Sequence, residues 1–318
     1  MANMFTVASK EFSDIVRGKR FLLLVVVFGL VMTAAVANVY LSATQSAGGR
    51  PGMPTGFLRS VASSLVTMMS FFAPIMGIAL GVDAISGEKE KGTLKLTLAQ
   101  PIFRDTLING KFLAAFLAIS LATLIASLVN IGGSVLALGI TPTGEDVARL
   151  MLFMLFSILF AMTFYGIAAL LSTVSKRTTQ SVIISVVLWV IFAFIISIVA
   201  SLIASAMVPI SFQPGQNITR DQNPEMIAAF TKRTAITETI SSVTPNYHFT
   251  KIAGYVLQVS VNIGMGFGGA GRPGQTDIRA VSVMESLGSA WPNILVLMLV
   301  TVLTFIASYM LFTRQEVR

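Results

Sequence analysis

Six long apolar segments dominate the pattern of hydrophobic and polar positions along the chain. They cover residues 21–40, 58–82, 112–138, 150–174, 181–208 and 294–312. A hydrocarbon core about 30 Å thick requires about 20 apolar residues per helical crossing, because lipid offers no partner to an unpaired backbone amide. The pattern therefore predicts an all-α polytopic membrane protein with six transmembrane helices.

The composition supports the same class. The 318 residues are 54% hydrophobic and 11% charged, whereas about a quarter of the residues in a soluble domain are charged. The first apolar segment resembles a signal peptide, but its apolar run is too long and no small-residue cleavage site precedes Asn38. We expect it to be a spanning helix.

Residues 1–20 are expected to form an amphipathic helix ahead of the first span, with a bend near Gly18. Apolar side chains recur there at helical spacing, at Phe5, Ala8, Phe12, Ile15 and Val16. This pattern favours a helix lying in the cytoplasmic membrane interface. The alternative is a cytoplasmic cap on the helical bundle.

The distribution of Lys and Arg predicts the orientation. Thirteen of the 22 positive residues flank the spans on one side, and the short loops of the other side carry only Arg50, Arg59 and Arg149. Because short loops rich in positive charge stay in the cytoplasm, both termini are expected there, in a multi-pass protein of the cell membrane. The positive residues that set the orientation then explain the net charge of +8, and we expect no nucleic-acid partner.

Catalytic and metal sites are not expected in this chain. It has no cysteine and one histidine, His248, which excludes Cys nucleophiles and the usual zinc ligand sets. The glycines of residues 87–93 lack the lysine of a phosphate-binding loop, and those of residues 264–269 are flanked by no strand and helix. Energy must therefore come from another subunit or from an ion gradient.

The most informative stretch is the charged segment 83–111, between the second and third apolar segments. Its sequence resembles the motif that follows the second helix in type-two ATP-binding-cassette (ABC) exporter permeases. The matching residues are Asp83, Ile85, Ser86, Gly87, Glu88, Glu90, Gly92, Thr93, Leu94, Pro101, Arg104, Gly110 and Lys111.

The resemblance implies that this segment forms a short helix that docks into a separate cytoplasmic ATPase. From the residues, Gly87 and Gly92 allow tight turns, Thr93 can cap a helix over residues 94–98, and Pro101 ends it. The alternating charges of residues 88–91 would suit a polar partner surface. The alternative is a charged loop that is only solvated.

A transport pathway is expected beside the second span. The resemblance implies that the second and fifth spans line the route between two permease copies. Pro74 should kink the second span and leave an adaptable, Met-rich surface. The candidate pathway residues are Met68, Met69, Phe71, Phe72, Pro74 and Met76. The alternative for all six is ordinary helix packing.

Residues 209–293 form an extracytoplasmic segment that is too long for a simple connection. Helical stripes are expected in it at Ile227, Phe230, Ile236 and Ile240, at Phe249, Ile252 and Val256, and at Ile278, Val281, Leu287 and Trp291. A glycine-rich loop covers residues 264–274, and Asn217 begins a glycosylation acceptor. We expect the segment to gate substrate exit or to engage an external partner; the alternative is a cap that shields the helices.

The expected function is that of the permease subunit of an ABC exporter. It would act as two identical or related copies in membrane lipid, with ATP and magnesium bound only by the partner ATPases. A gradient-driven secondary transporter is one alternative, although the middle of every predicted span lacks Asp, Glu, Lys, Arg and His. A non-transporting membrane scaffold is the other.

Overall fold

The computed structural model describes residues 3–45, 57–93, 103–139, 141–209, 224–259 and 282–314. Every regular element in these ranges is a helix, and six helical stretches are long and apolar enough to cross a membrane. They are Lys19–Leu41, Ala62–Glu90, Arg104–Ala137, Gly144–Val174, Thr178–Met207 and Val283–Arg314. The six predicted spans are confirmed.

The N-terminal helix and the first span are separate elements. Helix α1 (Met4–Arg17) ends at Gly18, whose backbone is extended, and α2 (Lys19–Gln45) begins directly after it. Helix α1 packs against the third span, with Val7 against Gly110. The bend expected near Gly18 is confirmed.

The centre of the bundle is formed by α3 (Phe57–Gly81), α6 (Arg104–Leu138) and α7 (Gly144–Val174). Helices α6 and α7 begin earlier than the apolar pattern predicted, at residues 104 and 144 instead of 112 and 150. Polar first turns continue both helices beyond the apolar run. In α7 a capping box defines the start, because Thr143 and Asp146 bond each other's backbone amides.

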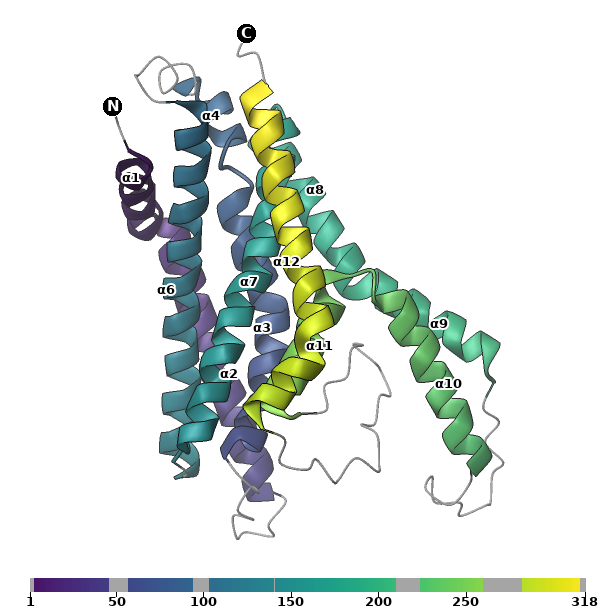
Figure 1. The fold of residues 1–318 in the computed structure, drawn as a ribbon. Helices are drawn as coiled ribbons and strands as arrows, with labels where there is room; N and C mark the ends of the chain where they lie inside the picture. The colour runs from purple at the N-terminus through teal and green to yellow at the C-terminus, as the bar shows by residue number, and fades with distance from the viewer. Residues whose placement is uncertain are drawn as a thin grey trace.

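The fifth span contains an irregularity that the sequence pattern did not predict. It consists of α8 (Thr178–Val190), a π-helical turn η1 (Ile191–Ile195) and α9 (Ile196–Met207). Helix α9 packs against α10 (Pro224–Ser241), and the two diverge from the rest of the bundle (Figure 1).

The segment between the fifth and sixth spans contributes to the core. Helix α11 (Pro245–Leu257) packs against α3, α7 and α12 (Val283–Arg314), where the Phe249 ring stacks 4.3 Å from that of Phe160. The expected stripe of Phe249, Ile252 and Val256 is fully buried. In α10, by contrast, Ile227 is exposed.

Other expectations for this segment lie outside the described residues: Asn217, residues 264–274, Ile278 and Val281. The last span begins at residue 283, eleven residues before the predicted start.

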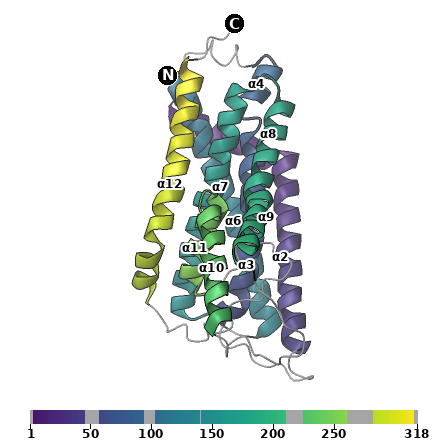
Figure 2. The same ribbon diagram turned by 90° about the vertical axis from the view of Figure 1, so that its right-hand side faces the viewer.

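Helix α1, the short helix α4 (Ser86–Glu90) and the C-terminal end of α12 lie at the same end of the bundle (Figures 1 and 2). We call this end the α1 end.

Candidate functional site

Helix α4 follows α3 at the end of the second span, and hydrogen bonds from backbone amides fix it to α7. The amides of Ile85 and Ser86 donate to the Ser172 hydroxyl oxygen over 3.1 and 2.9 Å. The Ser172 hydroxyl donates in turn to Ser86 Oγ, which lies 3.0 Å away. Both serines are fully buried. Since these groups satisfy one another, the start of α4 is held firmly against the fourth span.

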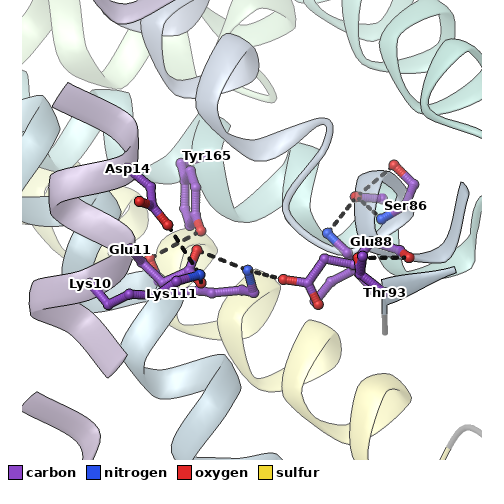
Figure 3. Close-up of polar contacts among 10 residues, drawn as sticks. Lys10, Glu11, Asp14, Ser86, Glu88, Thr93, Lys111 and Tyr165 are labelled. Atoms are coloured by element: carbon purple, nitrogen blue, oxygen red, sulfur yellow. Dashed lines mark hydrogen bonds and ion pairs between the residues drawn. The ribbon is translucent and has the colours of Figure 1, made fainter. Parts of the chain in front are cut away.

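A buried lysine joins α4 to α6 and to the N-terminal helix. The Lys111 ammonium lies 2.6 Å from Glu88 Oε1 and 3.0 Å from Glu11 Oε2, and only 8% of the lysine side chain is exposed. Figure 3 shows Lys111 between the two carboxylates. The backbone carbonyl of Lys111 accepts a hydrogen bond from the buried Tyr165 hydroxyl of α7. The Lys111 ammonium therefore joins three segments that are distant in sequence: α1, α4 and α6.

The remaining polar side chains of the segment also reach neighbouring helices. Asp83 pairs with Arg20 of α2, and Lys89 donates to the carbonyl of Thr173 in α7. The Glu90 carboxylate accepts from the amide of Thr178 over 3.1 Å, at the first turn of α8. Residues 83–90 are thus tied by side chains to α2, α6, α7 and α8.

One expectation about this segment is wrong. Gly87 lies inside α4 and forms no tight turn, whereas Gly92 does adopt the left-handed conformation, with φ of 70°. Glu88 and Lys89 are partly buried and contact neighbouring helices, whereas Glu90 and Lys91 are exposed. The polar partner surface expected over residues 88–91 stays a prediction.

The rest of the predicted motif lies at the edge of the described residues. Lys91, Gly92 and Thr93 are exposed, and the Thr93 hydroxyl donates to the Glu88 carbonyl over 3.4 Å. Leu94, Pro101 and the helix expected over residues 94–98 lie outside the described residues. Arg104 begins α6 and donates to the carbonyl of Thr313, near the end of α12.

Electrostatics favour the ionised form of Glu11. Burial alone would raise its pKa, but the attraction of Lys111, together with that of Lys10, holds the pKa below its usual value. Lys10 is 68% exposed and pairs with both Glu11 and Asp14. The contact between α1 and α6 is therefore an ion pair near neutral pH.

Comparison with known proteins identifies the family. The family described as ABC-2 family transporter protein matches residues 5–317. This chain belongs to the ABC-2 transporter family. It is 33% identical over 177 residues to the probable ABC transporter permease protein NosY of Pseudomonas aeruginosa, and 31% identical over 176 residues to the protein of that name from Stutzerimonas stutzeri. Each match covers 54% of this chain and 60% of the relative.

In this ABC-2 permease the six residues proposed for the pathway do not share one environment. Met69, Pro74 and Met76 are buried among the chain's own helices, and the Phe72 ring stacks 4.9 Å from that of Phe28. Met68 and Phe71 are half-buried. The Phe71 ring lies 5.9 Å from that of Phe194 in the π-helical turn, between the second and fifth spans.

A second polar centre, which the sequence analysis missed, lies at the opposite end of the permease. Arg149 of α7 is 1% exposed; it donates over 2.8 Å to the carbonyl of Val256 in α11 and over 3.1 Å to Ser286 Oγ in α12. Its other nitrogens bond Glu145, one turn earlier. An arginine four residues after a glutamate, at the start of an apolar run, was the available signal. Arg149 fixes the last turn of α11 to two spans.

His248 has a structural environment. Its ring nitrogens lie 2.9 Å from Asn293 Oδ1 and 2.8 Å from the carbonyl of Ser242, which joins the start of α11 to α12 and to the end of α10. Within the described ranges, no group of three or more His, Asp and Glu side chains is arranged to hold a metal ion.

Proposed function

We propose that this chain is the transmembrane permease subunit of an ABC exporter, driven by ATP hydrolysis in a separate ATPase that docks on the segment around α4. The observation that carries the proposal is the set of contacts from residues 83–90 to α2, α6, α7 and α8. A movement of residues 83–90 would therefore act directly on these four helices. In this proposal the α1 end and both chain termini lie in the cytoplasm.

We assign the docking surface to the exposed residues that follow α4. Gly92 and Thr93 are exposed there, and residues 94–102 come next in the sequence. The inward contacts of Glu88 and Lys89 would transmit the movement instead of binding the ATPase. In this mechanism, nucleotide binding to the ATPase moves α4. The contacts of α4 with Lys111 and Ser172 then move α6 and α7.

A second copy of the permease completes the pathway in this proposal. In the most apolar window of the fifth span, Thr178–Met207, 6% of the residues are buried by the chain itself, compared with 11% for the sixth span and 56% for the fourth. Helices α9 and α10 also diverge from the bundle (Figure 1). Such an uncovered span next to Met68 and Phe71 suits an interface between copies, with the substrate route beside it. The apolar walls favour an amphipathic or lipid-like substrate.

The coupling proposal is tested with two matched glycine variants. Gly92 and Gly139 both have left-handed backbones, with φ of 70° and 69°, and no atom within 4 Å of an added Cβ. Proline cannot adopt this conformation. We expect Gly92→Pro to release the ATPase encoded beside this permease or to uncouple its activity. Gly139→Pro, at the opposite end of α6, should leave both intact. Equal behaviour of the two variants would contradict the coupling role.

The second copy is tested by cross-linking, which is simple because the chain has no cysteine. Ile198→Cys on α9 and Leu299→Cys on α12 introduce thiols at positions with 53% and 57% exposure. We expect a bifunctional maleimide to yield dimers in native membranes from Ile198→Cys and not from Leu299→Cys. Dimers from the α12 position alone would place the interface elsewhere. Stimulation of ATPase activity by amphipathic compounds in the reconstituted complex tests the substrate class.

A further inference from the structure

A polar cleft of about 460 Å³ lies at the α1 end between α2, α4 and α8. This size is within the usual range of small-molecule sites, about 300–1,000 Å³. Figure 2 shows all three helices on the side of the bundle away from α12. The cleft is separate from the buried Lys111 cluster.

The lining of the cleft changes from charged to apolar over one helical turn. Its polar part includes Arg20, Lys91 and Thr178, and its apolar part consists of Val182 and Ile183 of α8. The two apolar side chains are 37% and 58% exposed. Arg20 and Thr178 are among the first residues of their spans, so the change occurs where a span enters the membrane. A phospholipid has the same sequence of groups, a charged headgroup followed by acyl chains.

The cations of the cleft keep donors for an anionic headgroup. Two carboxylates also line it: Asp83 pairs with Arg20, and Glu90 keeps its charge while it accepts hydrogen bonds from Thr178. No ion pair joins Lys91 to a residue in the described ranges, and its side chain is exposed. Arg20 is 74% exposed and uses one guanidinium nitrogen for Asp83, which leaves further N–H donors.

We propose that this cleft binds a membrane glycerophospholipid by its phosphodiester headgroup. Lys91 and Arg20 hold the phosphate, and the acyl chains lie along Val182 and Ile183. The lipid also contacts α4 through Lys91, so the site places a lipid against the helix that the proposed mechanism moves. The geometry of the cleft carries this inference, and it does not depend on the permease exporting anything.

Native mass spectrometry of the delipidated full-length chain in detergent tests the site. The protein is titrated with dioctanoyl phosphatidylglycerol, with dioctanoyl phosphatidylethanolamine, and separately with inorganic phosphate. We expect Lys91→Gln to weaken lipid binding roughly ten-fold, as expected for the loss of one charge-assisted hydrogen bond. The matched control, Lys176→Gln, removes an equal charge outside the cleft and should bind lipid as wild type does.

A second variant distinguishes lipid from free phosphate. Ile183→Gln keeps every charge and should weaken binding of both lipids by reducing contact with the acyl chains. Equal losses in Lys91→Gln and Lys176→Gln would overturn the site in favour of diffuse electrostatic attraction. Wild-type lipid binding by Lys91→Gln would also overturn it. Competition by inorganic phosphate at the lipid's own concentration would overturn the lipid as the occupant.

Discussion

Lys111 of α6 lies 2.6 Å from Glu88 of α4, and both side chains are largely buried. The same ammonium pairs with Glu11 of α1. One cation thus compensates two carboxylates from different segments. Removing one partner of a buried ion pair leaves charge without compensation, which costs far more than losing a pair at the surface.

The first prediction concerns this cluster. Lys111→Met should destabilise the permease by about 3–5 kcal/mol, because Glu88 then loses its cation and Glu11 keeps only the exposed Lys10. Lys10→Met is the matched control, since Lys10 also pairs with Glu11 but is largely exposed, and it should cost less than about 1 kcal/mol. Thermal unfolding of the detergent-solubilised protein measures both. Similar melting temperatures for the two variants would show that the buried position of Lys111 contributes nothing.

The second prediction is a pH dependence set by Glu11. Its pKa is lowered in the folded protein by Lys111 and Lys10, so its stabilising effect is complete above the usual glutamate pKa of about 4.3. The effect is lost as the pH falls through the lowered pKa. The stability difference between wild type and Glu11→Gln should therefore be constant from about pH 7 to 5 and shrink below about pH 4.3. A difference that grows on acidification would contradict the assigned direction.

The third prediction concerns the close approach of α3 and α7. A Cβ added at Gly77 would lie 2.2 Å from the carbonyl oxygen of Ala161, which is backbone and cannot move aside. Gly77→Ala should separate the two helices and cost at least about 1–3 kcal/mol. Gly29→Ala in α2, where no atom lies within 4 Å, should be tolerated. Yields of folded protein and melting temperatures test the pair, and equal yields would indicate that the helices do not pack this closely.

The fourth prediction concerns Arg149. Arg149→Lys keeps the charge but loses the planar donor set that reaches Val256 and Ser286 together. Amide hydrogen exchange should accelerate in α11 and in the first turns of α12. Glu145→Gln is the control, because Glu145 is 58% exposed and its change leaves the bonds to α11 and α12 in place. Unchanged exchange in Arg149→Lys would show that packing alone fixes α11.

The candidate site was partly predictable from the sequence. The motif located the segment, and Gly92 has the turn conformation expected of it. Which way the charged side chains point was not predictable, because Glu88 pairs with Lys111, 23 residues away along the chain, and that lysine also pairs with Glu11, 77 residues from Glu88. A local pattern of alternating charges gives no information on contacts at such separations. For the same reason the roles of Ser172 and Thr178 became apparent only in the folded chain.

By itself, the sequence determined the six spans and the position of the charged segment between the second and third. A bilayer imposes a minimum apolar length on each crossing, and this requirement can be checked one segment at a time. Only the tertiary structure decided that α11 enters the core, that the fifth span contains a π-helical turn, and that Lys111 joins α1, α4 and α6. These features depend on contacts between distant segments, and such contacts are set by how the helices pack together.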